Sequence, residues 1–408
     1  MWHVRLARRP GTGDVLHDRG SAMRLIHTSD WHLGRTLHGE SLLEHQAVFL
    51  DWLLTEAVSQ QADAVVVAGD IYDRAVPSTD AVKLLGAALV GFFRARIPVM
   101  LTSGNHDSAV RLGFASELSE EAGIHLRTRP ADIGRPLLVR DAHGEVGIYG
   151  IPYLLPDAVM TELGAERSHA SVLAAASARI RADASARGLR RTVVAAHAFV
   201  TGGQASQSER DIRVGGIGDT PVSALAGCSY LALGHLHGQQ RVDAGGTTAG
   251  YSGSPLAFSF SERHHTKSVT LAEIDGTGQV VTRLLPAPVP RPLREVRGRL
   301  DDLLARADTD LAELSGAWVK AVLTDQARPA APMERLRERW PHTIALEFAP
   351  EGGLTSPDAD LARLAEAVDP VEICELFVDY VAGAPPDTAQ RAVLRQAVEA
   401  AQQSEAAA

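Results

Sequence analysis

Five short polar motifs each follow directly on an apolar run of the sequence, and they are rich in aspartate and histidine. The motifs are SDWH, AGDIYD, SGNHD, GHLH and the histidine of VVAAHAF, which supply Asp30, His32, Asp70, Asp73, Asn105, His106, Asp107, His197, His235 and His237. Carboxylate, imidazole and amide ligands without a thiolate suit manganese, iron or zinc, and they disfavour a closed structural zinc site built from cysteines. These donors outnumber the needs of one ion. The sequence therefore predicts two ions that share a carboxylate, about 3.5–4 Å apart as in two-metal hydrolases.

Such a pair of ions clamps a phosphate, lowers the pKa of a bridging water, and stabilises the attacking and leaving oxygens together. Each motif alone is weak evidence, because a lone DxH or HxH is more often a surface pair or a satisfied core pair, and NHD is a good turn sequence. His27, His38 and His45 have no paired ligand and are expected to be structural. The order of the motifs, each placed just after a strand-like run, favours a common site at the carboxyl ends of sheet strands.

The elements that must position these motifs alternate between strand-like and helical patterns from Met23 onward. The predicted strands are Arg24–Thr28, Ala64–Ala68, Val99–Thr102, Val146–Ile151, Thr192–Ala196, Tyr230–Leu233, Ser268–Ile274 and Val280–Leu285. Helical spacing of apolar residues predicts helices over Leu42–Ser59, 79–94 and 171–187. This pattern is typical of an α/β protein whose sheets are covered by helices.

A proline-rich linker, Pro286–Pro292, ends this pattern, because it cannot continue a strand or a helix. Beyond it, helices over Leu300–Leu314 and Pro332–Trp340 and strands over Trp318–Leu323 and Thr343–Phe348 predict a small α/β module. We accordingly expect a disordered or mis-assigned extension over 1–22, a catalytic domain over 23–285, a capping domain over 291–350 and a helical tail over 356–403.

The tail has two apolar helical stripes. The first contains Ile373, Leu376, Phe377, Tyr380 and Val381, and the second contains Val393, Leu394, Ala397 and Val398 after a predicted N-cap, Asp387. The stripes suit either packing on their own domain or a contact with a partner.

The composition sets outer limits on function. The chain has 408 residues and a formal net charge of −10. This charge disfavours a protein that binds nucleic acid mainly through a broad basic surface, although bound metal ions can still attract phosphate. No apolar run approaches 18 residues, so no membrane span is predicted. Two cysteines, Cys228 and Cys374, cannot form a disulfide framework, so we expect a cytoplasmic protein. No G-x-x-x-x-G-K-[ST] loop is present, so any ATPase must be another chain.

In order, the motifs DxH, GDxxD, GNHD, H and GHxH resemble those of the calcineurin-like metallophosphoesterase superfamily. The longer segments RLIHTSDWHLGRTLHG, VVVAGDIYDRAVPS, TSGNHDSAVRLGF, LALGHLHGQQ and YSGSPLAFSFSE resemble its SbcD branch, the nuclease subunits of bacterial SbcCD complexes. The resemblance implies a two-sheet metallophosphoesterase sandwich flanked by helices, followed by a small α/β capping domain and C-terminal helices.

The resemblance also implies site roles. The first ion would be held by Asp30, His32, Asp70 and His237, and the second by Asp70, Asn105, His197 and His235. His106 would be a general acid or phosphate-orienting group, with Asp107 fixing its tautomer, and Asp73 would contact substrate.

The activity implied by the resemblance is manganese-dependent 3′→5′ exonuclease on double-stranded DNA and endonuclease on single-stranded or hairpin DNA. The ATP dependence would come from an SbcC-type ATPase that binds the tail, in a heterotetramer built on a homodimer of this chain. The site residues alone leave two alternatives open, which are a small-molecule metallophosphodiesterase and a non-catalytic scaffold for SbcC. From the sequence, Leu112 and Phe114 could equally belong to a dimer surface or to the core.

Overall fold

The computed structural model describes residues 22–209, 220–350, 369–382 and 385–406, so the predicted extension lies outside it except for residue 22. Contacts within the chain divide it after Pro290 into two units. In the described residues, no helix has both the length and the apolar character that a membrane span requires.

The first sheet of the first unit has the strand order β14-β13-β1-β4-β5-β6. Its strands are β1 (Met23–Thr28), β4 (Ala64–Ala68), β5 (Val99–Thr102), β6 (Ile124–Arg127), β13 (Ser268–Ile274) and β14 (Val280–Pro286). Strands β1, β4, β5 and β6 run parallel, and β13 and β14 complete one edge in antiparallel pairing.

The second sheet has the order β11-β12-β10-β9-β8-β7. Its strands are β7 (Leu137–Asp141), β8 (Gly144–Ile151), β9 (Arg191–His197), β10 (Tyr230–Gly234), β11 (Gln240–Ala244) and β12 (Thr247–Tyr251). Strands β8, β9, β10 and β12 are parallel, whereas the edge strands β7 and β11 are antiparallel to their neighbours. A short hairpin of β2 (Thr36–Leu37) and β3 (Glu40–Ser41) lies apart from both sheets.

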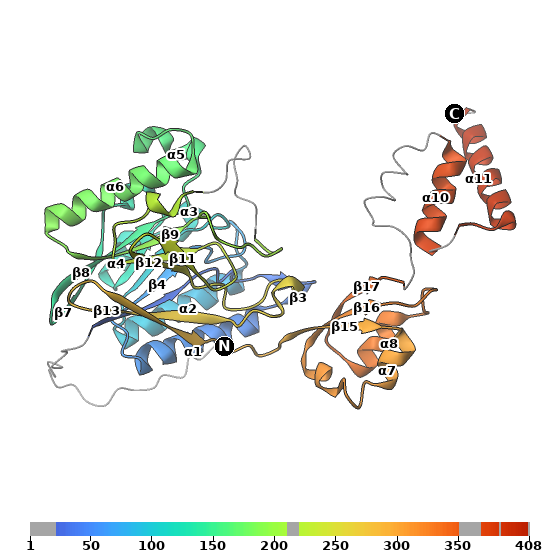
Figure 1. Ribbon diagram of the computed structural model, residues 1–408, viewed down its shortest axis with the longest axis horizontal. Helices are drawn as coiled ribbons and strands as arrows, with labels where there is room; N and C mark the ends of the chain where they lie inside the picture. Colours follow the sequence, from blue (N-terminus) through green and yellow to red (C-terminus); the bar gives the residue numbers. More distant parts are fainter. Residues whose placement is uncertain (1–21, 210–219, 351–368, 383–384, 407–408) are drawn as a thin grey trace. The chain divides into compact units, whose positions relative to one another are not determined.

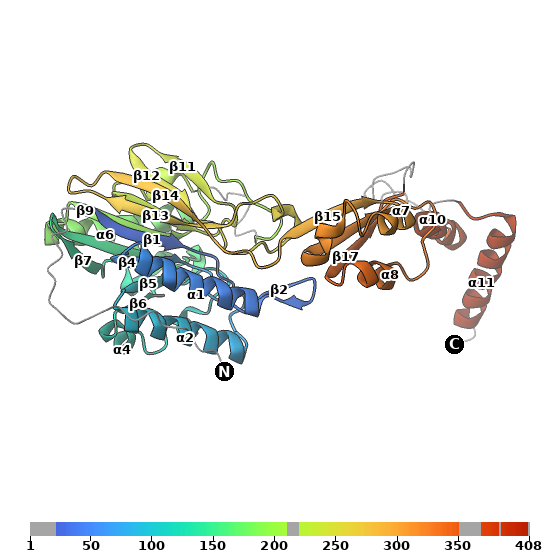
Figure 2. The same ribbon diagram turned by 90° about the horizontal axis from the view of Figure 1, so that it is seen from below.

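Buried side chains on both faces of the strands explain the layering. Successive side chains of a strand point to opposite faces, so Val65 and Val67 of β4 join the core formed with the helices, while Val66 joins the core between the two sheets. The helices α1 (Leu43–Ser59) and α2 (Thr79–Ala95) cover the first sheet, and α5 (Pro156–Leu163) and α6 (His169–Arg187) cover the second. The result is a four-layer sandwich (Figures 1 and 2), which confirms the predicted fold class.

The short helices α3 (Ala109–Leu112) and α4 (Ser116–Glu121) follow the SGNHD motif. Leu112 is buried, whereas Phe114 is 83% exposed, so the two residues that the sequence left open belong to different environments.

The second unit contains a parallel sheet of β15 (Leu293–Gly298), β16 (Trp318–Leu323) and β17 (Thr343–Phe348), with β16 in the centre. Helices α7 (Leu300–Ala305) and α8 (Pro332–Arg339) accompany it, and its core includes Leu336 and Trp340. The expected helix over Leu300–Leu314 was wrong in its second half, since α7 ends at Ala305 and a 3-10 turn occupies Ala312–Gly316. Asp308, Thr309 and Asp310 favour a turn between them.

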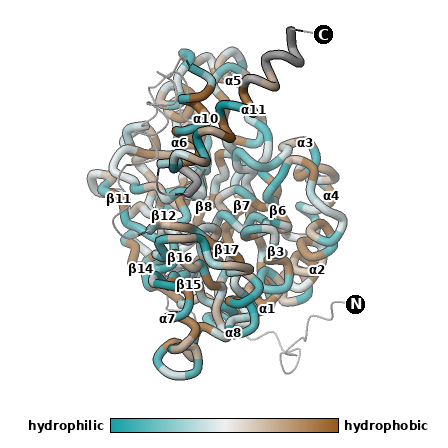
Figure 3. The backbone as a smooth tube through the Cα atoms, turned by 90° about the vertical axis from the view of Figure 1, so that its right-hand side faces the viewer, coloured by the Kyte–Doolittle hydropathy of each residue, from teal (hydrophilic) through white to brown (hydrophobic). Residues whose placement is uncertain are grey.

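The tail forms α10 (Pro370–Ala382) and α11 (Thr388–Ala406). The predicted N-cap is confirmed, because the Asp387 carboxylate accepts a hydrogen bond from the Gln390 main-chain N–H at 2.8 Å. The two helices contact each other, with an ion pair between Arg391 and Glu375. The alternating hydrophobic and hydrophilic residues of α10 can be followed in Figure 3. The side chains of Tyr380 and Val381 lie outside the described part of the chain.

Candidate metal centre

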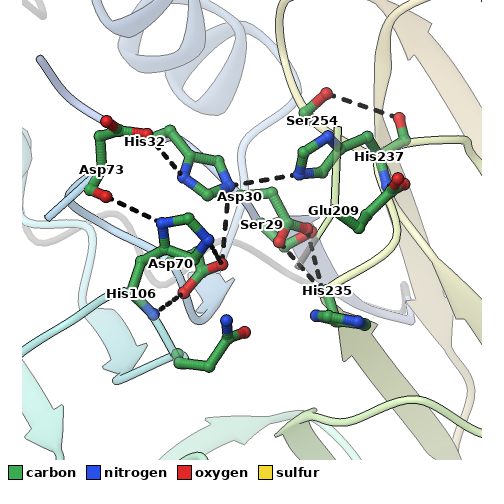
Figure 4. A network of polar contacts seen from close by, with 12 residues as sticks. Ser29, Asp30, His32, Asp70, Asp73, His106, Glu209, His235, His237 and Ser254 are labelled. Atoms are coloured by element: carbon green, nitrogen blue, oxygen red, sulfur yellow. Dashed lines mark hydrogen bonds and ion pairs between the residues drawn. The ribbon is translucent and has the colours of Figure 1, made fainter. Parts of the chain in front are cut away.

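The predicted metal-ligating residues come from the carboxyl ends of strands in both sheets. Asp30 and His32 follow β1, Asp70 follows β4, and Asn105 follows β5 of the first sheet, whereas His197 ends β9 and His235 and His237 follow β10 of the second. Figure 4 shows the side chains from the two sheets pointing toward one another. The meeting of two sets of strand ends brings together residues as far apart in the sequence as Asp30 and His235.

The backbone around the site adopts conformations that ordinary residues rarely use. Asp30, His32, Asp70 and His235 have positive φ angles of 54°, 44°, 50° and 110°. The segments after β1 and β4 run side by side, since Asp30 N–H donates to Gly69 O and His32 N–H donates to Asp70 O, both at 3.0 Å. Backbone strain of this kind is retained where the surrounding structure fixes it, typically at functional sites.

Glycine makes the close approach of the two sheets possible. Gly69, with φ of 85°, immediately precedes Asp70, and a Cβ at this position would lie 2.3 Å from His197 Nδ1. A Cβ on Gly104 would lie 2.1 Å from Asp70 Oδ1. Either side chain would displace a ligand, so the glycines of the GD and GNHD motifs have a packing function.

One group of ligand atoms is formed by Asp30, His32 and His237. The Nε2 atoms of His32 and His237 lie 3.2 Å apart. The Asp30 carboxylate accepts hydrogen bonds from Ser29 Oγ at 2.5 Å and from the His235 main-chain N–H at 3.0 Å. All three ligand side chains are buried, so their positions are fixed by packing as well as by hydrogen bonds.

Asp70 lies between this group and a second one. Its Oδ2 is 3.5 Å from His32 Nε2 and 3.5 Å from His197 Nε2. His197 Nε2 is in turn 2.9 Å from Asn105 Oδ1. The ring of His235 lies against that of His197, with the ring centroids 5.4 Å apart. The arrangement therefore has one carboxylate in the middle and candidate ligands on both sides of it.

Electrostatics of the cluster fit a bound cation. Burial and the neighbouring charge of Asp70 raise the pKa of Asp30, while burial and the proximity of His237 lower the pKa of His32. His197 Nδ1 contacts the carbonyl oxygen of Ala68 at 2.9 Å. A carbonyl oxygen only accepts, so Nδ1 carries the proton and the lone pair of Nε2 faces Asn105 Oδ1, which is another acceptor. A cation coordinated by both atoms would relieve the repulsion between these two acceptors, so the pair suits a metal site.

His106 is adjacent to the cluster, as the sequence predicted. Its main-chain N–H donates to Asp70 Oδ1 at 2.9 Å, and its Nε2 is 4.0 Å from Asp70 Oδ2. Its Nδ1 bonds the main-chain carbonyl oxygen of Asp73 at 2.8 Å. This bond fixes the tautomer of the His106 ring, which leaves Nε2 directed to the site.

The carboxylate of Asp107 is held by main-chain groups. Its carboxylate accepts hydrogen bonds from the main-chain N–H groups of Ile71, Tyr72 and Gly104 at 2.9–3.0 Å. Asp107 thus ties together the loops after β4 and β5, and the main chain of Asp73 orients His106. Burial and the charge of Asp70 raise the pKa of Asp107 to about 7.

The carboxylate of Asp73 contacts other site residues. Its Oδ1 is 3.4 Å from an Arg35 guanidinium nitrogen and 3.6 Å from His32 Nδ1. A contact with substrate, which the sequence predicted, would therefore compete with these two neighbours. His27 is structural, as expected. Its ring is buried between Tyr230 Oη at 2.9 Å and Leu233 O at 3.1 Å, and burial lowers its pKa to about 3.

Sequence reasoning missed several polar residues that support the ligands. These are Ser29, Ser208, Glu209, Ser252, Glu262 and Lys267. The SGSPLAFSFSE segment contains two of them, but no local spacing reveals what their side chains contact. Only Lys267 gave a partial sequence signal of a special role, because it is one of three lysines in the chain and follows directly on a polar loop.

Comparison with known proteins agrees with the fold class. Residues 23–173 match the family described as calcineurin-like phosphoesterase, and residues 289–382 match the family described as type 5 capsule protein repressor C-terminal domain. The chain is similar to SbcD, the D component of the nuclease SbcCD, from Rhodobacter capsulatus, with 34% identity over 375 residues, which covers 85% of this chain and 90% of that protein.

Two further relatives have the same name. The Bacillus subtilis protein is 38% identical over 269 residues, covering 62% of this chain and 66% of that protein, and the Staphylococcus saprophyticus protein is 29% identical over 331 residues, covering 79% and 84%. The fold is that of a calcineurin-like phosphoesterase, and the clusters of aspartate and histidine are consistent with a dimetal site. Within that class, the chain belongs to the SbcD family, the nuclease subunits of SbcCD complexes.

Proposed function

We propose that the chain is the nuclease subunit of an SbcCD-type DNA repair and recombination complex, and that it hydrolyses phosphodiester bonds at a two-metal site. The observation that carries this proposal is the position of Asp70, whose Oδ2 is equally far, 3.5 Å, from the ligand atoms of His32 and His197. A shared carboxylate between two sets of buried nitrogen and oxygen ligands is what a two-metal hydrolase requires.

We assign the ligands as the family resemblance implies. Asp30, His32, Asp70 and His237 would hold one ion, and Asp70, Asn105, His197 and His235 would hold the other. We propose manganese as the physiological metal, since this donor set contains imidazole, carboxylate and amide but no thiolate. When bound, the two ions supply Lewis acidity and a nucleophilic hydroxide at neutral pH.

The protein's own residues orient the substrate and handle the proton. His106 presents Nε2 to the site while its Nδ1 is held by Asp73 O, so a protonated ring can donate from Nε2 to the leaving oxygen of the phosphodiester. The buried position of the ligands excludes bulk water from the side of the metals that faces the protein. The expected substrates are double-stranded DNA for 3′→5′ exonuclease action and single-stranded or hairpin DNA for endonuclease action.

The names of the relatives imply a second subunit, SbcC. We propose that an SbcC-type ATPase binds the tail of this chain, where Phe377 of α10 is 57% exposed and Val393 of α11 is 65% exposed. We propose a cytoplasmic location for the protein, which is consistent with DNA as its substrate.

We also propose that two copies of this chain pair within a heterotetramer. Exposed apolar side chains around α3 and α4 suit such a surface: Val110, Phe114 and Leu118 are 86%, 83% and 76% exposed. Apolar patches of this kind are typical of protein contacts.

A labelled DNA hairpin with Mn²⁺, with and without the partner ATPase, tests the activity. Metal-dependent cleavage that EDTA abolishes is expected. Cleavage of a small diester such as bis-p-nitrophenyl phosphate without cleavage of any DNA would favour the small-molecule phosphodiesterase. Binding of SbcC by a chain that neither binds manganese nor cleaves a diester would favour the non-catalytic scaffold.

Truncation after residue 355 tests the tail. The shortened chain should keep Mn²⁺-dependent cleavage of single-stranded DNA and lose binding to SbcC in a pull-down. A stable, active truncation that still binds SbcC with unchanged affinity would move the docking site to another part of the chain.

A further inference from the structure

A chain of buried and half-buried polar side chains contacts His237 at Nδ1, the ring nitrogen that does not face His32. Ser208 Oγ is 2.6 Å from His237 Nδ1 and 2.5 Å from Glu262 Oε1. Glu262 Oε2 is 2.5 Å from Lys267 Nζ, and the two side chains are 0% and 3% exposed. These residues belong to neither proposed set of metal ligands.

The positions of the protons follow from the types of group. The Lys267 ammonium lies 2.5 Å from Glu262 Oε2, and a positive charge this close favours the ionised form of the carboxylate. The ionised Glu262 only accepts, so the single Ser208 hydroxyl proton is donated to it. The Ser208 hydroxyl also lies 2.9 Å from Ser206 Oγ. With its own proton given to Glu262, its contact with His237 has Nδ1–H as the donor, and the lone pair of His237 Nε2 is left on the side that faces His32.

Lys267 also holds the main chain of the ligand. An ammonium group has three N–H donors, and here they bond Glu262 Oε2, the carbonyl oxygen of His237 at 3.0 Å and Ser254 Oγ at 2.9 Å. The main-chain N–H of His237 donates to Glu209 Oε1 at 2.8 Å. Both the ring and the backbone of His237 are thus fixed by side chains from elsewhere in the chain. Figure 4 shows the contact of Ser254 Oγ with the carbonyl oxygen of His237.

Two other imidazoles of the site are fixed in a different way. His197 and His106 each bond a main-chain carbonyl through Nδ1, that of Ala68 and that of Asp73. A main-chain acceptor survives any side-chain substitution. The tautomer of His237 instead depends on side chains that can be replaced, and this makes the dependence testable.

We infer that Ser208, Glu262 and Lys267 are positioning residues that hold His237 in the tautomer and orientation in which its Nε2 can bind a metal ion. This inference rests on the two-metal site proposed above. Outer partners of ligating histidines usually contribute 10- to 100-fold to metal affinity. Here the carboxylate contacts the imidazole through the Ser208 hydroxyl and also directly, with Glu262 Oε1 3.5 Å from His237 Nδ1, and the lysine keeps that carboxylate charged.

The most informative variant replaces both members of the ion pair, Glu262→Met with Lys267→Met. Replacing a buried pair by apolar residues of similar volume is often neutral for stability, whereas removing one partner leaves an unpaired buried charge. Without Glu262, the Ser208 hydroxyl is free to donate to His237 Nδ1, so both tautomers become populated. The matched control is Asp141→Leu with Arg191→Met, which removes a buried pair, 2.6 Å apart, at the opposite end of β9 from His197.

Two measurements are made on each protein. Nitrogen NMR of the metal-free, histidine-labelled protein reports the tautomer of His237, with the signals assigned by a His237→Gln variant. Titration with Mn²⁺ under calorimetry reports the number and affinity of bound ions. We expect the Glu262→Met/Lys267→Met protein to melt near the wild-type temperature, to show mixed His237 tautomers, and to bind one of its two ions 10- to 100-fold more weakly.

The control protein should keep the wild-type tautomer and both affinities. An unchanged tautomer and unchanged Mn²⁺ affinities in the Glu262→Met/Lys267→Met protein would overturn the inference. Failure of the two-metal proposal itself would be recognised separately, because the wild-type protein would then bind fewer than two ions.

Discussion

Replacement of His106 by alanine should remove most of the turnover and leave both metal ions bound. The main-chain N–H of His106, which donates to Asp70 Oδ1 at 2.9 Å, is retained in the variant. The ring makes a separate bond to Asp73 O and is not needed to hold the carboxylate. Truncation of the side chain therefore removes the proton donor without removing a support of the proposed bridging ligand.

The size of the effect follows from these contacts. General acid–base groups contribute about 10²–10⁴-fold, which corresponds to about 2.7–5.4 kcal/mol of transition-state stabilisation. The loss of one hydrogen bond between side chain and main chain costs only about 0.5–1.5 kcal/mol of folding free energy. The variant should therefore be folded at the assay temperature and deficient mainly in the chemical step.

The assay compares the cleavage rate of a labelled hairpin with the manganese content of the same preparation, measured by elemental analysis. His143→Ala is a suitable control, since His143 is exposed in the turn between β7 and β8. A loss of manganese in step with activity would refute the reasoning and make His106 a metal ligand. Unchanged turnover with full metal content would refute the proton-donor role.

Three further predictions concern the metal site and its support. Asp70→Ala should weaken the binding of both ions in a Mn²⁺ titration, whereas His32→Ala should weaken the binding of mainly one, because Asp70 Oδ2 is 3.5 Å from ligand atoms on both sides. Equal loss of a single ion in the two variants would contradict the shared position of Asp70. Gly69→Ala places a Cβ 2.3 Å from His197 Nδ1 at a φ of 85°, with a backbone strain of at least about 1–2 kcal/mol, so it should lower the melting temperature and weaken the binding of one ion. Melting and titration curves of the variant that match those of the wild type would show that the loop relaxes freely. The pKa of Asp107 is raised to about 7 in the folded protein, so its protonated carboxyl stabilises the metal-free fold fully at a pH below the pKa of the unfolded chain, and this stabilisation is lost as the pH rises through 7. The unfolding free energy in EDTA should therefore fall by up to about 1.4 kcal/mol per pH unit between pH 5 and 7. Asp107→Asn should flatten this slope, and equal slopes for the two proteins would refute the assignment.

The strands that position the site were predictable because they are buried on both faces. Continuous apolar runs such as Ala64–Ala68 have a strong sequence signal, and a polar residue just after such a run lies at the edge where a parallel sheet binds ligands. Asp30, Asp70 and Asn105 were found in this way. The strands β6, β7, β11, β12 and β15 were missed. The edge strands β7 and β11 alternate between more and less buried residues, so they lack a continuous apolar run.

The support of the ligands could not be predicted from sequence spacing. Asp107 follows His106 directly, but its carboxylate turns to main-chain N–H groups of the loops after β4 and β5. Glu262 is 25 residues from His237 and reaches it through Ser208, which precedes both. Such contacts depend on how loops from different strands pack together, and neighbours in the sequence do not indicate them.

The central claim is that one chain holds two metal ions with Asp70 between them. Anomalous diffraction at the manganese absorption edge, on crystals of the protein grown with Mn²⁺, tests it most directly. We expect two anomalous peaks about 3.5–4 Å apart, one beside His32 and His237 and the other beside Asn105 and His197, with a carboxylate oxygen of Asp70 contacting both. A single peak, or two peaks of which Asp70 contacts only one, would contradict the account.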